Sequence, residues 1–153
     1  MASAALPGSP RRFELTLPAT RSGFARGFDE LHRGLDALQL DPRGRFAAEL
    51  VFEEVVANVL RHGTQPGTET RVSLAVELQG DDLRLTVLDD GVPFDPRDRP
   101  DPAPPTDLEH AEAGGRGLML IRSVSSSVEY QRTPEGQNRL IIAVRAKKRA
   151  APG

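Results

Sequence analysis

The chain of 153 residues contains no cysteine, and its aromatic residues make up only 5% of the sequence. The absence of cysteine excludes disulfides, thiol nucleophiles and cysteine-ligated metals, and it fits a cytoplasmic protein. The scarcity of aromatic side chains argues against binding nucleic acid by base stacking. The formal net charge is −2, so no strong electrostatic field favours nucleic acid or a membrane surface as a partner.

Long apolar runs are missing as well. None approaches the ~20 residues that a membrane span needs, and the first ten residues lack the apolar segment of a secretory signal. The three histidines are scattered, with no pair at a spacing of four for zinc. We therefore expect no membrane or secretory segment, and the length suffices for one domain with a core.

Short periodic segments make up most of the chain. Apolar residues at helical spacing predict helices from about residue 20 to 40, over 49–63 and over 118–124, with a break at 41–44. Alternation of apolar and polar residues predicts strands at 13–17, 72–78, 83–88, 128–132 and 140–144. This order of elements predicts a two-layer α/β sandwich, an α+β fold with helices on one face of the sheet.

Three regions lack such a pattern. Residues 1–11 are predicted to form a disordered leader and 147–153 a flexible basic tail, which leaves 12–146 as one domain. Between Asp90 and Glu112, six prolines prevent regular structure. A segment of this kind inside a compact domain is usually a lid or a linker.

Glu54 and Asn58 form an unusual polar pair in the predicted helix 49–63. They are four residues apart, so they lie on the same side of the helix, among apolar side chains. Burying them without partners would cost roughly 2 kcal/mol or more. A bound ligand or metal would supply the partners; the structural alternative is that Glu54 caps a backbone or pairs with an arginine and Asn58 bonds a loop.

Two glycine-containing motifs flank the proline-rich segment. Asp89-Asp-Gly91 ends a strand, where a carboxylate can accept a hydrogen bond from an exocyclic amine while the glycine lets the backbone turn beneath a ring. Gly114-Gly-Arg-Gly117 opens the last helix, where backbone N–H groups and the helix dipole favour an anion. It is not a P-loop, because no Gly-Lys-Ser/Thr follows. Each motif alone is also common as an ordinary turn or hinge.

In this order, the motifs resemble those of the ATP-binding domain shared by gyrase, Hsp90, histidine kinases and MutL, the GHKL superfamily with the Bergerat fold. Within it, the chain is most similar to the small anti-sigma-factor serine/threonine kinases. Glu54 to Gly63 resembles their N box, Asp89 to Pro96 their first glycine box, and Gly114 to Leu118 their second. The resemblance covers residues 13–146 and implies a mixed, mostly antiparallel sheet with a proline-rich ATP lid.

The resemblance also implies roles for individual residues. Asn58 would bind Mg²⁺, a hard cation that prefers oxygen ligands, and Glu54 would act as general base on a serine hydroxyl. Asp89 would accept the adenine amine, and Gly91 would let the ring lie close. The other implied nucleotide contacts are His62, Gly114, Gly115, Arg116, Gly117 and Leu118.

The sequence departs from the family pattern at two places. Kinase members carry an arginine just before the second glycine box, where this chain has Ala113; Arg116 is the nearest substitute. A threonine that supports the adenine pocket through water in the family is replaced by either Gln137 or Asn138. The loss of a positioned cation can cost on the order of 10³ in the rate of phosphoryl transfer.

The expected function is that of an ATP- and Mg²⁺-binding regulatory kinase of bacterial transcription. It would bind a sigma factor and phosphorylate a STAS-domain anti-anti-sigma partner, as a cytoplasmic homodimer without direct contact to nucleic acid or membrane. One alternative is a nucleotide-gated binding module for the same partners with weak or no kinase activity. Another is a detached catalytic domain of the histidine-kinase type, which would need a separate partner bearing the acceptor histidine.

Overall fold

The computed structural model describes residues 11–64, 67–98 and 117–145. Within these ranges the chain forms one five-stranded sheet of order β1-β2-β3-β5-β4 and three α-helices. The helices are α1 (Arg21–Leu38), α2 (Pro42–Asn58) and α3 (Gly117–Val124). The strands are β1 (Arg12–Pro18), β2 (Arg71–Gln79), β3 (Asp82–Asp89), β4 (Ser127–Arg132) and β5 (Asn138–Arg145).

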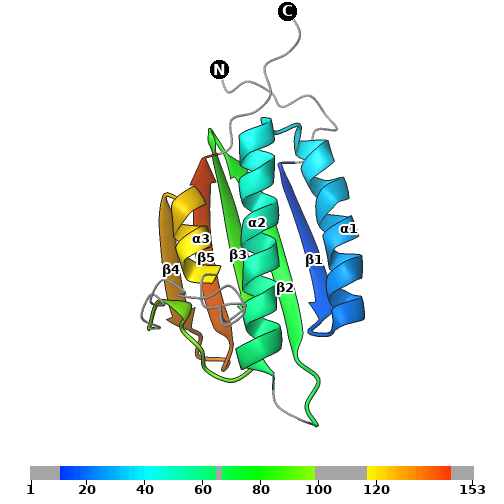
Figure 1. Ribbon diagram of the computed structural model, residues 1–153, viewed down its shortest axis with the longest axis vertical. Coiled ribbons are helices and arrows are strands. Elements are labelled where there is room, and N and C mark those ends of the chain that lie inside the picture. The colour runs from blue at the N-terminus through cyan, green and yellow to red at the C-terminus, as the bar shows by residue number, and fades with distance from the viewer. Residues whose placement is uncertain (1–10, 65–66, 99–116, 146–153) are drawn as a thin grey trace, which may run out of the picture.

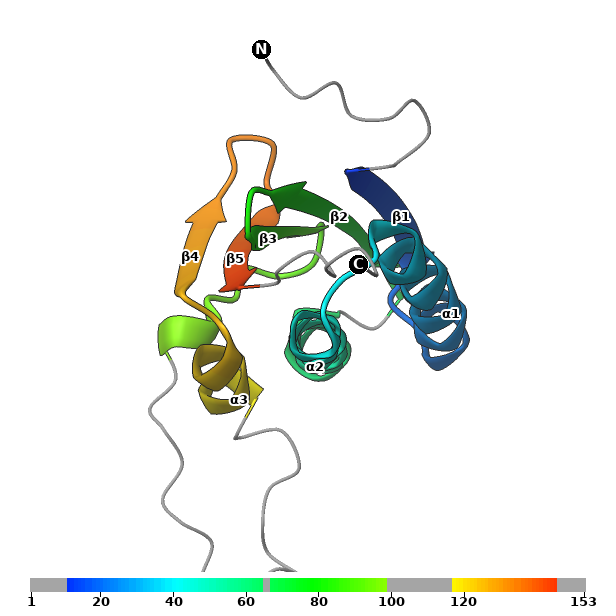
Figure 2. The same ribbon diagram turned by 90° about the horizontal axis from the view of Figure 1, so that it is seen from above.

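The helices all lie on one face of the sheet (Figures 1 and 2). This confirms the predicted two-layer α/β sandwich, an α+β fold with its helices on one face of the sheet. Every strand pairing among the described residues is antiparallel, so the mixed sheet that we expected contains no parallel pair there. The reason is that β4 and β5 form a hairpin whose second strand, β5, returns to lie beside β3.

The core lies between the sheet and the helices. Strand residues alternate between the two faces of a sheet, and the inward rows are apolar along most of their length. These rows contain Leu15 and Leu17 of β1, Val72, Leu74 and Val76 of β2, Leu83, Leu85 and Val87 of β3, and Leu140, Ile142 and Val144 of β5. Two of these inward rows also contain a polar residue. Asp89 is the last inward residue of β3, and Asn138 is the first inward residue of β5. Both polar side chains are therefore directed toward the helices at one end of the sheet.

Helix α1 lies close over β1 because small residues face the strand. Thr20 caps the helix by accepting a hydrogen bond from the Gly23 N–H at 3.0 Å. A Cβ at Gly34 would meet the Phe13 ring at 2.5 Å, so a side chain at this position would require the ring to move. Packing against β1 thus explains a residue that weakens an isolated helix.

Helix α2 begins earlier than expected. The predicted break at residues 41–44 is wrong beyond Asp41, because Asp41 caps the helix and Pro42 is preorganised for its first turn. At its other end, α2 passes into a π-helical turn, Val59–Gly63. The predicted helix end at Gly63 is therefore reached, but in a wider helical geometry that often occurs at functional sites.

Several predicted segments lie outside the described residues. These are the leader except Arg11, the tail 147–153, and residues 99–116, which contain most of the predicted lid. The described part of the lid, up to Asp98, contains one short 3₁₀ turn, Pro96–Asp98. Among the residues that the structure describes, no helix has both the length and the apolar character needed to cross a bilayer.

Candidate functional site

The π-helical turn that follows α2 is hydrogen-bonded to the segment that follows β3. The Val92 N–H donates a hydrogen bond to the Gly63 carbonyl oxygen at 3.0 Å. A Cβ at Gly91 would overlap that same carbonyl oxygen, so a side chain there would push the two backbones apart. The resemblance assigns Gly91 to the adenine ring; the structure adds a packing reason for glycine at this position.

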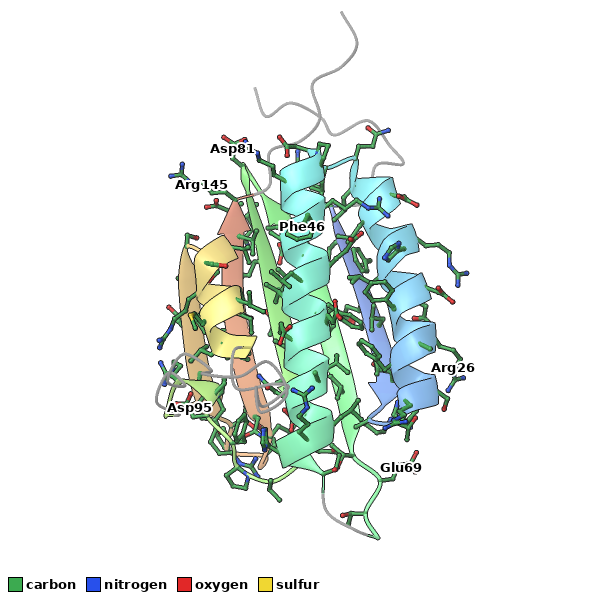
Figure 3. All side chains as sticks on the ribbon, in the orientation of Figure 1. Arg26, Phe46, Glu69, Asp81, Asp95 and Arg145 are labelled. Carbon is green, nitrogen blue, oxygen red and sulfur yellow. The ribbon has the colours of Figure 1, made fainter. Side chains whose placement is uncertain are left out.

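Ring stacking adds a second connection between these segments. His62, in the π-helical turn, stacks on Phe94 with ring centroids 5.2 Å apart and an interplanar angle of 21°. The Phe94 N–H in turn donates to Oδ1 of Asn138, at the start of β5, at 3.2 Å. Tertiary contacts therefore bring the end of the predicted N box, the first glycine box and the start of β5 to one place. Asp95, labelled in Figure 3, lies toward this same end of the sheet.

Asp89 is buried where these segments meet, with a relative exposure of 7%. Its Oδ1 accepts hydrogen bonds from the Gly91 N–H at 3.0 Å and from Nδ2 of Asn138 at 2.9 Å. Burial raises the pKa of Asp89, while these two hydrogen bonds and the charge of Arg132 oppose the rise. No hydrogen bond to Oδ2 occurs within the described residues, so this oxygen is available to a ligand.

Asn138 hydrogen-bonds through its side chain to five different groups, more than its predicted role of supporting the adenine pocket suggested. Its side chain is 4% exposed and spans the gap between Asp89 and the segment after β3. Nδ2 donates to Asp89 and to the Val92 carbonyl oxygen at 2.8 Å. Oδ1 accepts from the Phe94 N–H, the Tyr130 hydroxyl and the Arg132 guanidinium.

The structure thus distinguishes the two residues that the sequence offered in place of the family threonine. Asn138 contacts Asp89 directly, whereas the Gln137 N–H donates to the Thr133 hydroxyl in the β4–β5 turn. The alternation along β5 indicated that Asn138 is the buried one of the two residues, because it precedes Leu140 and Ile142 in the buried row. The alternation along β5 could not predict that Asn138 lies opposite Asp89, because that pairing depends on the register between β3 and β5.

Glu54 and Asn58 lie in the last turns of α2. Asn58 is 9% exposed, and its side-chain amide has no hydrogen bond within the part of the chain that the structure describes. Glu54 is half-buried and, within the same ranges, makes neither a hydrogen bond nor an ion pair. Burial, with the nearby charge of Glu53, raises the pKa of Glu54, and Arg61 opposes the rise. The alternative in which both side chains are satisfied by the protein therefore finds no support here.

The donor set fits one kind of metal. The described residues contain no group of three or more His, Cys, Asp or Glu side chains placed to hold a metal ion. Mg²⁺ is usually bound through one or two side chains together with water and substrate phosphates. A single buried amide oxygen, that of Asn58, has no hydrogen-bond partner among the described residues, which is consistent with this mode of binding.

The second glycine box is only partly described. Gly114, Gly115 and Arg116 lie outside the described residues, as does Ala113. Gly117 is the first residue of α3, and Leu118 follows it with 9% exposure. Helix α3 contacts α2, which places the end of this box, Gly117 and Leu118, on the same face of the sheet as Asn58. The assigned phosphate contacts remain predictions.

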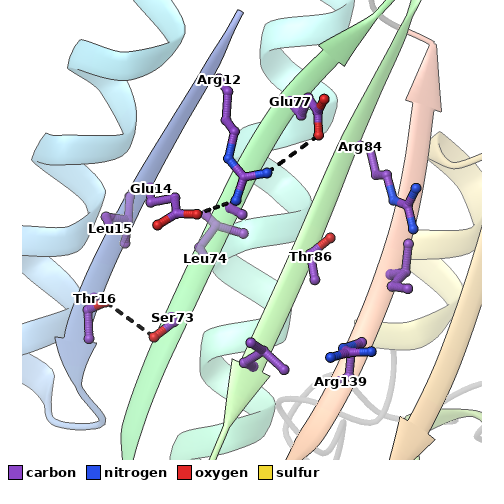
Figure 4. A pocket seen from close by; sticks show the side chains of 13 residues that line it. Arg12, Glu14, Leu15, Thr16, Ser73, Leu74, Glu77, Arg84, Thr86 and Arg139 are labelled. Atoms are coloured by element: carbon purple, nitrogen blue, oxygen red, sulfur yellow. Dashed lines mark hydrogen bonds and ion pairs between the residues drawn. The ribbon is translucent and has the colours of Figure 1, made fainter.

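A hollow of about 540 Å³ lies elsewhere, on the face of the sheet that the helices leave open (Figure 4). Side chains of β1, β2, β3 and β5 line it, including the ion-paired Arg12, Glu14 and Glu77. It contains none of the residues that the sequence predicted for the site. The polar residues at the end of the sheet, rather than this hollow, therefore define the candidate site.

Comparison with known proteins agrees with this assignment. The sequence pattern of the histidine kinase-like ATPase domain family matches residues 17–143. The chain is 30% identical over 100 residues to the serine/threonine-protein kinase BtrW of Bordetella bronchiseptica, which covers 65% of this chain and 70% of that protein. It is also 30% identical over 99 residues to an anti-sigma F factor of Oceanobacillus iheyensis, covering 63% of this chain and 68% of the relative.

A solved structure has the same fold. The RsbU and RsbW domains of Rv1364c from Mycobacterium tuberculosis superimpose with a TM-score of 0.63 at 19% identity. The match covers 92% of this chain but only 34% of that one, so the chain spans about a third of the solved protein.

The chain belongs to the histidine kinase-like ATPase domain family and, within it, to the anti-sigma serine/threonine kinases. This confirms the resemblance that the three motifs carried. Membership in an ATPase family implies that the chain binds ATP.

Proposed function

We propose that this chain is a Mg²⁺-dependent protein kinase that binds a sigma factor and phosphorylates a STAS-domain anti-anti-sigma partner on serine or threonine. The names of its relatives, a serine/threonine kinase and an anti-sigma factor, support both parts of the proposal. The observation that carries the proposal is that Glu54 and Asn58 lie four residues apart on α2. Both are polar, neither has a hydrogen-bond partner among the described residues, and α2 leads into the turn whose Gly63 carbonyl oxygen accepts a hydrogen bond from the Val92 N–H, three residues after Asp89.

The proposed roles follow from the chemistry of these side chains. Asp89 would accept a hydrogen bond from the exocyclic amine of adenine, and the amide oxygen of Asn58 would hold Mg²⁺, which would supply positive charge near the phosphates. Glu54 takes the proton of the serine hydroxyl as the hydroxyl oxygen bonds to the γ-phosphorus. The bond from that phosphorus to the β–γ bridging oxygen breaks, and ADP leaves. Burial of Glu54 favours the reaction because it raises the pKa of the base toward the working pH.

Phosphorylation of the partner would also regulate binding. A phosphoserine adds nearly two negative charges at neutral pH. Placed on the contact surface, it would weaken the partner's hold on the kinase and leave the kinase free to bind the sigma factor. The homodimer expected from the family belongs to the same proposal.

The direct test is to incubate the chain with γ-labelled ATP, Mg²⁺ and the STAS-domain protein encoded nearest to it. We expect label on a serine or threonine of the partner, and no label when Mg²⁺ is chelated. Co-purification of the chain with a sigma factor, in the absence of the STAS protein, tests the binding part. If the wild-type chain binds no ATP, the proposed kinase activity is wrong.

A second function is favoured by one observation, Ala113 in place of the family arginine. Without that cation, the chain would be a nucleotide-gated binding module for the same partners. Binding of ATP and of both partners without any transfer of label would select this function over the kinase.

A further inference from the structure

We propose that Asn138 makes the site selective for 6-amino purines by holding Asp89 as a hydrogen-bond acceptor. The inference rests on the proposed function, because it takes Asp89 to contact the base of a bound nucleotide. It goes beyond that function by assigning the choice between adenine and guanine to a second residue that does not touch the base.

The orientation of the Asn138 amide follows from its neighbours. Its Oδ1 lies 3.2 Å from the Phe94 N–H and 3.1 Å from the Arg132 guanidinium, two groups that only donate. Its Nδ2 lies 2.8 Å from the Val92 carbonyl oxygen, a group that only accepts. Exchanging the oxygen and nitrogen would break all three hydrogen bonds in a site that is 4% exposed. Nδ2 is therefore the atom that faces Asp89.

This orientation determines the hydrogen bonding of Asp89. Oδ1 receives two donors, Nδ2 of Asn138 at 2.9 Å and the Gly91 N–H at 3.0 Å. Two donors on one oxygen stabilise the ionised carboxylate, which is purely an acceptor. Such a group can pair with the 6-amino group of adenine. It repels the 6-carbonyl oxygen of guanine, since both are then acceptors.

Burial of Asp89 acts in the opposite direction. Asp89 is 7% exposed, and burial favours the neutral acid, whose hydroxyl can donate to a carbonyl. Two charged groups act on it: Arg132 on β4 favours the ionised form, and Asp90 opposes it. In the π-helical turn that follows α2, Gly63 packs against Gly91 and Val92, and it carries no charged side chain. Asn138 supplies the largest interaction that favours the acceptor form.

The isosteric substitution Asn138→Asp tests the inference. It replaces a donor by a second carboxyl group beside Asp89, and two adjacent carboxyl groups share a proton. Affinities for ATP and GTP would be measured by calorimetry on the full chain, with Mg²⁺, from about pH 5 to about pH 8. Near neutral pH we expect the preference for ATP over GTP to fall by about tenfold. The loss of ATP affinity on acidification should begin at a pH about one unit higher than in the wild type.

Two further variants separate selectivity from general damage. Gln137→Ala, next in the chain but not in contact with Asp89 through an observed hydrogen bond, should keep the wild-type ratio and pH profile. Arg132→Gln should move the pH profile in the same direction as Asn138→Asp but less, and it serves as the test if Asn138→Asp does not fold.

The outcomes are distinct. A folded Asn138→Asp chain with an unchanged ATP-to-GTP ratio and an unchanged pH profile would overturn this inference and leave the proposed function standing. A wild-type chain that binds neither nucleotide would overturn both.

Discussion

The two halves of α2 differ in whether their polar side chains have partners among the described residues. In the N-terminal half, Arg45 donates to Glu49 at 3.0 Å and pairs with Asp36 of α1, while His32 of α1 lies 3.5 Å from Glu49. In the C-terminal half, Glu54 and Asn58 have no such partners within the described residues. One helix therefore contains a set of charges that neutralise one another and a pair of polar groups that do not.

The difference indicates where stability and where function reside. Exposed ion pairs typically contribute between ~0 and 1 kcal/mol, so the Arg45 cluster joins α1 to α2 at little gain in stability. Leaving polar groups unpaired in a partly buried place costs stability, and proteins retain such groups mostly where a ligand completes them. Substitutions in the two halves should accordingly affect different measurements.

The largest effect is expected for Glu54→Gln. Removing the proposed base should lower the rate of label transfer to the STAS partner by about 10²–10⁴ while ATP affinity stays within about twofold. Because burial raises the pKa of Glu54, the wild-type rate should fall as the pH drops through that raised value, as the base becomes protonated. Glu53→Gln, at the exposed neighbouring position, is the matched control. Transfer by Glu54→Gln at the wild-type rate would show that Glu54 is not the base.

The next effect concerns Asn58→Ala. It should reduce ATP affinity by at least about tenfold in Mg²⁺, while the affinity measured in a chelator changes little. The free energy of unfolding should stay constant or rise, because the substitution removes a buried amide that has no hydrogen-bond partner among the described residues. Calorimetric titrations with and without Mg²⁺ check this. Equal Mg²⁺ dependence in the two proteins would remove Asn58 from the metal site.

Gly91→Ala tests whether the π-helical turn at the C-terminal end of α2 must pack closely against the segment after β3. The added Cβ would overlap the Gly63 carbonyl oxygen, so we expect a loss of about 1–3 kcal/mol in the free energy of unfolding and weaker ATP binding. Urea denaturation and nucleotide titration measure the two effects. Gly80→Ala, where a Cβ meets nothing within 4 Å, should cost only the strain of its φ of 61° and leave ATP binding unchanged.

The smallest effect is expected for Arg45→Ala. Because the pairs with Asp36 and Glu49 are partly exposed, their loss should reduce the free energy of unfolding by less than about 1 kcal/mol, and less still at high salt. ATP affinity and label transfer should not change. A large change in either would mean that the two halves of α2 are coupled, contrary to the comparison above.

Much of the fold could be predicted because its signals are local. Alternation over 72–78 and 83–88 identified β2 and β3 to within a residue at each end. The start of α2 was placed too late because residues 41–44 were predicted as a break, although Pro42 is suited to a first helical turn. The π-helical turn Val59–Gly63 is only five residues long, which is too short for its apolar pattern to differ from that of an α-helix. A continuous helix was therefore expected.

Prediction of the site succeeded in part for the same reason. Glu54 and Asn58 were recognisable as a pair because both lie on one helix, four residues apart. Asn138 remained one of two choices, since its partner Asp89 is 49 residues away in the chain. Residues 114–116 stay predictions from the motif alone.

By itself, the sequence determined the alternating strands, the two-layer arrangement and the motifs that identify an ATP-binding family, because periodicity and motif spacing are properties of neighbouring residues. Only the tertiary structure decided that Asn138, rather than Gln137, meets Asp89, and that Gly63 contacts Val92. Those contacts depend on strand register and on where a helix ends above a sheet, and these are set by packing of the whole core rather than by any single segment.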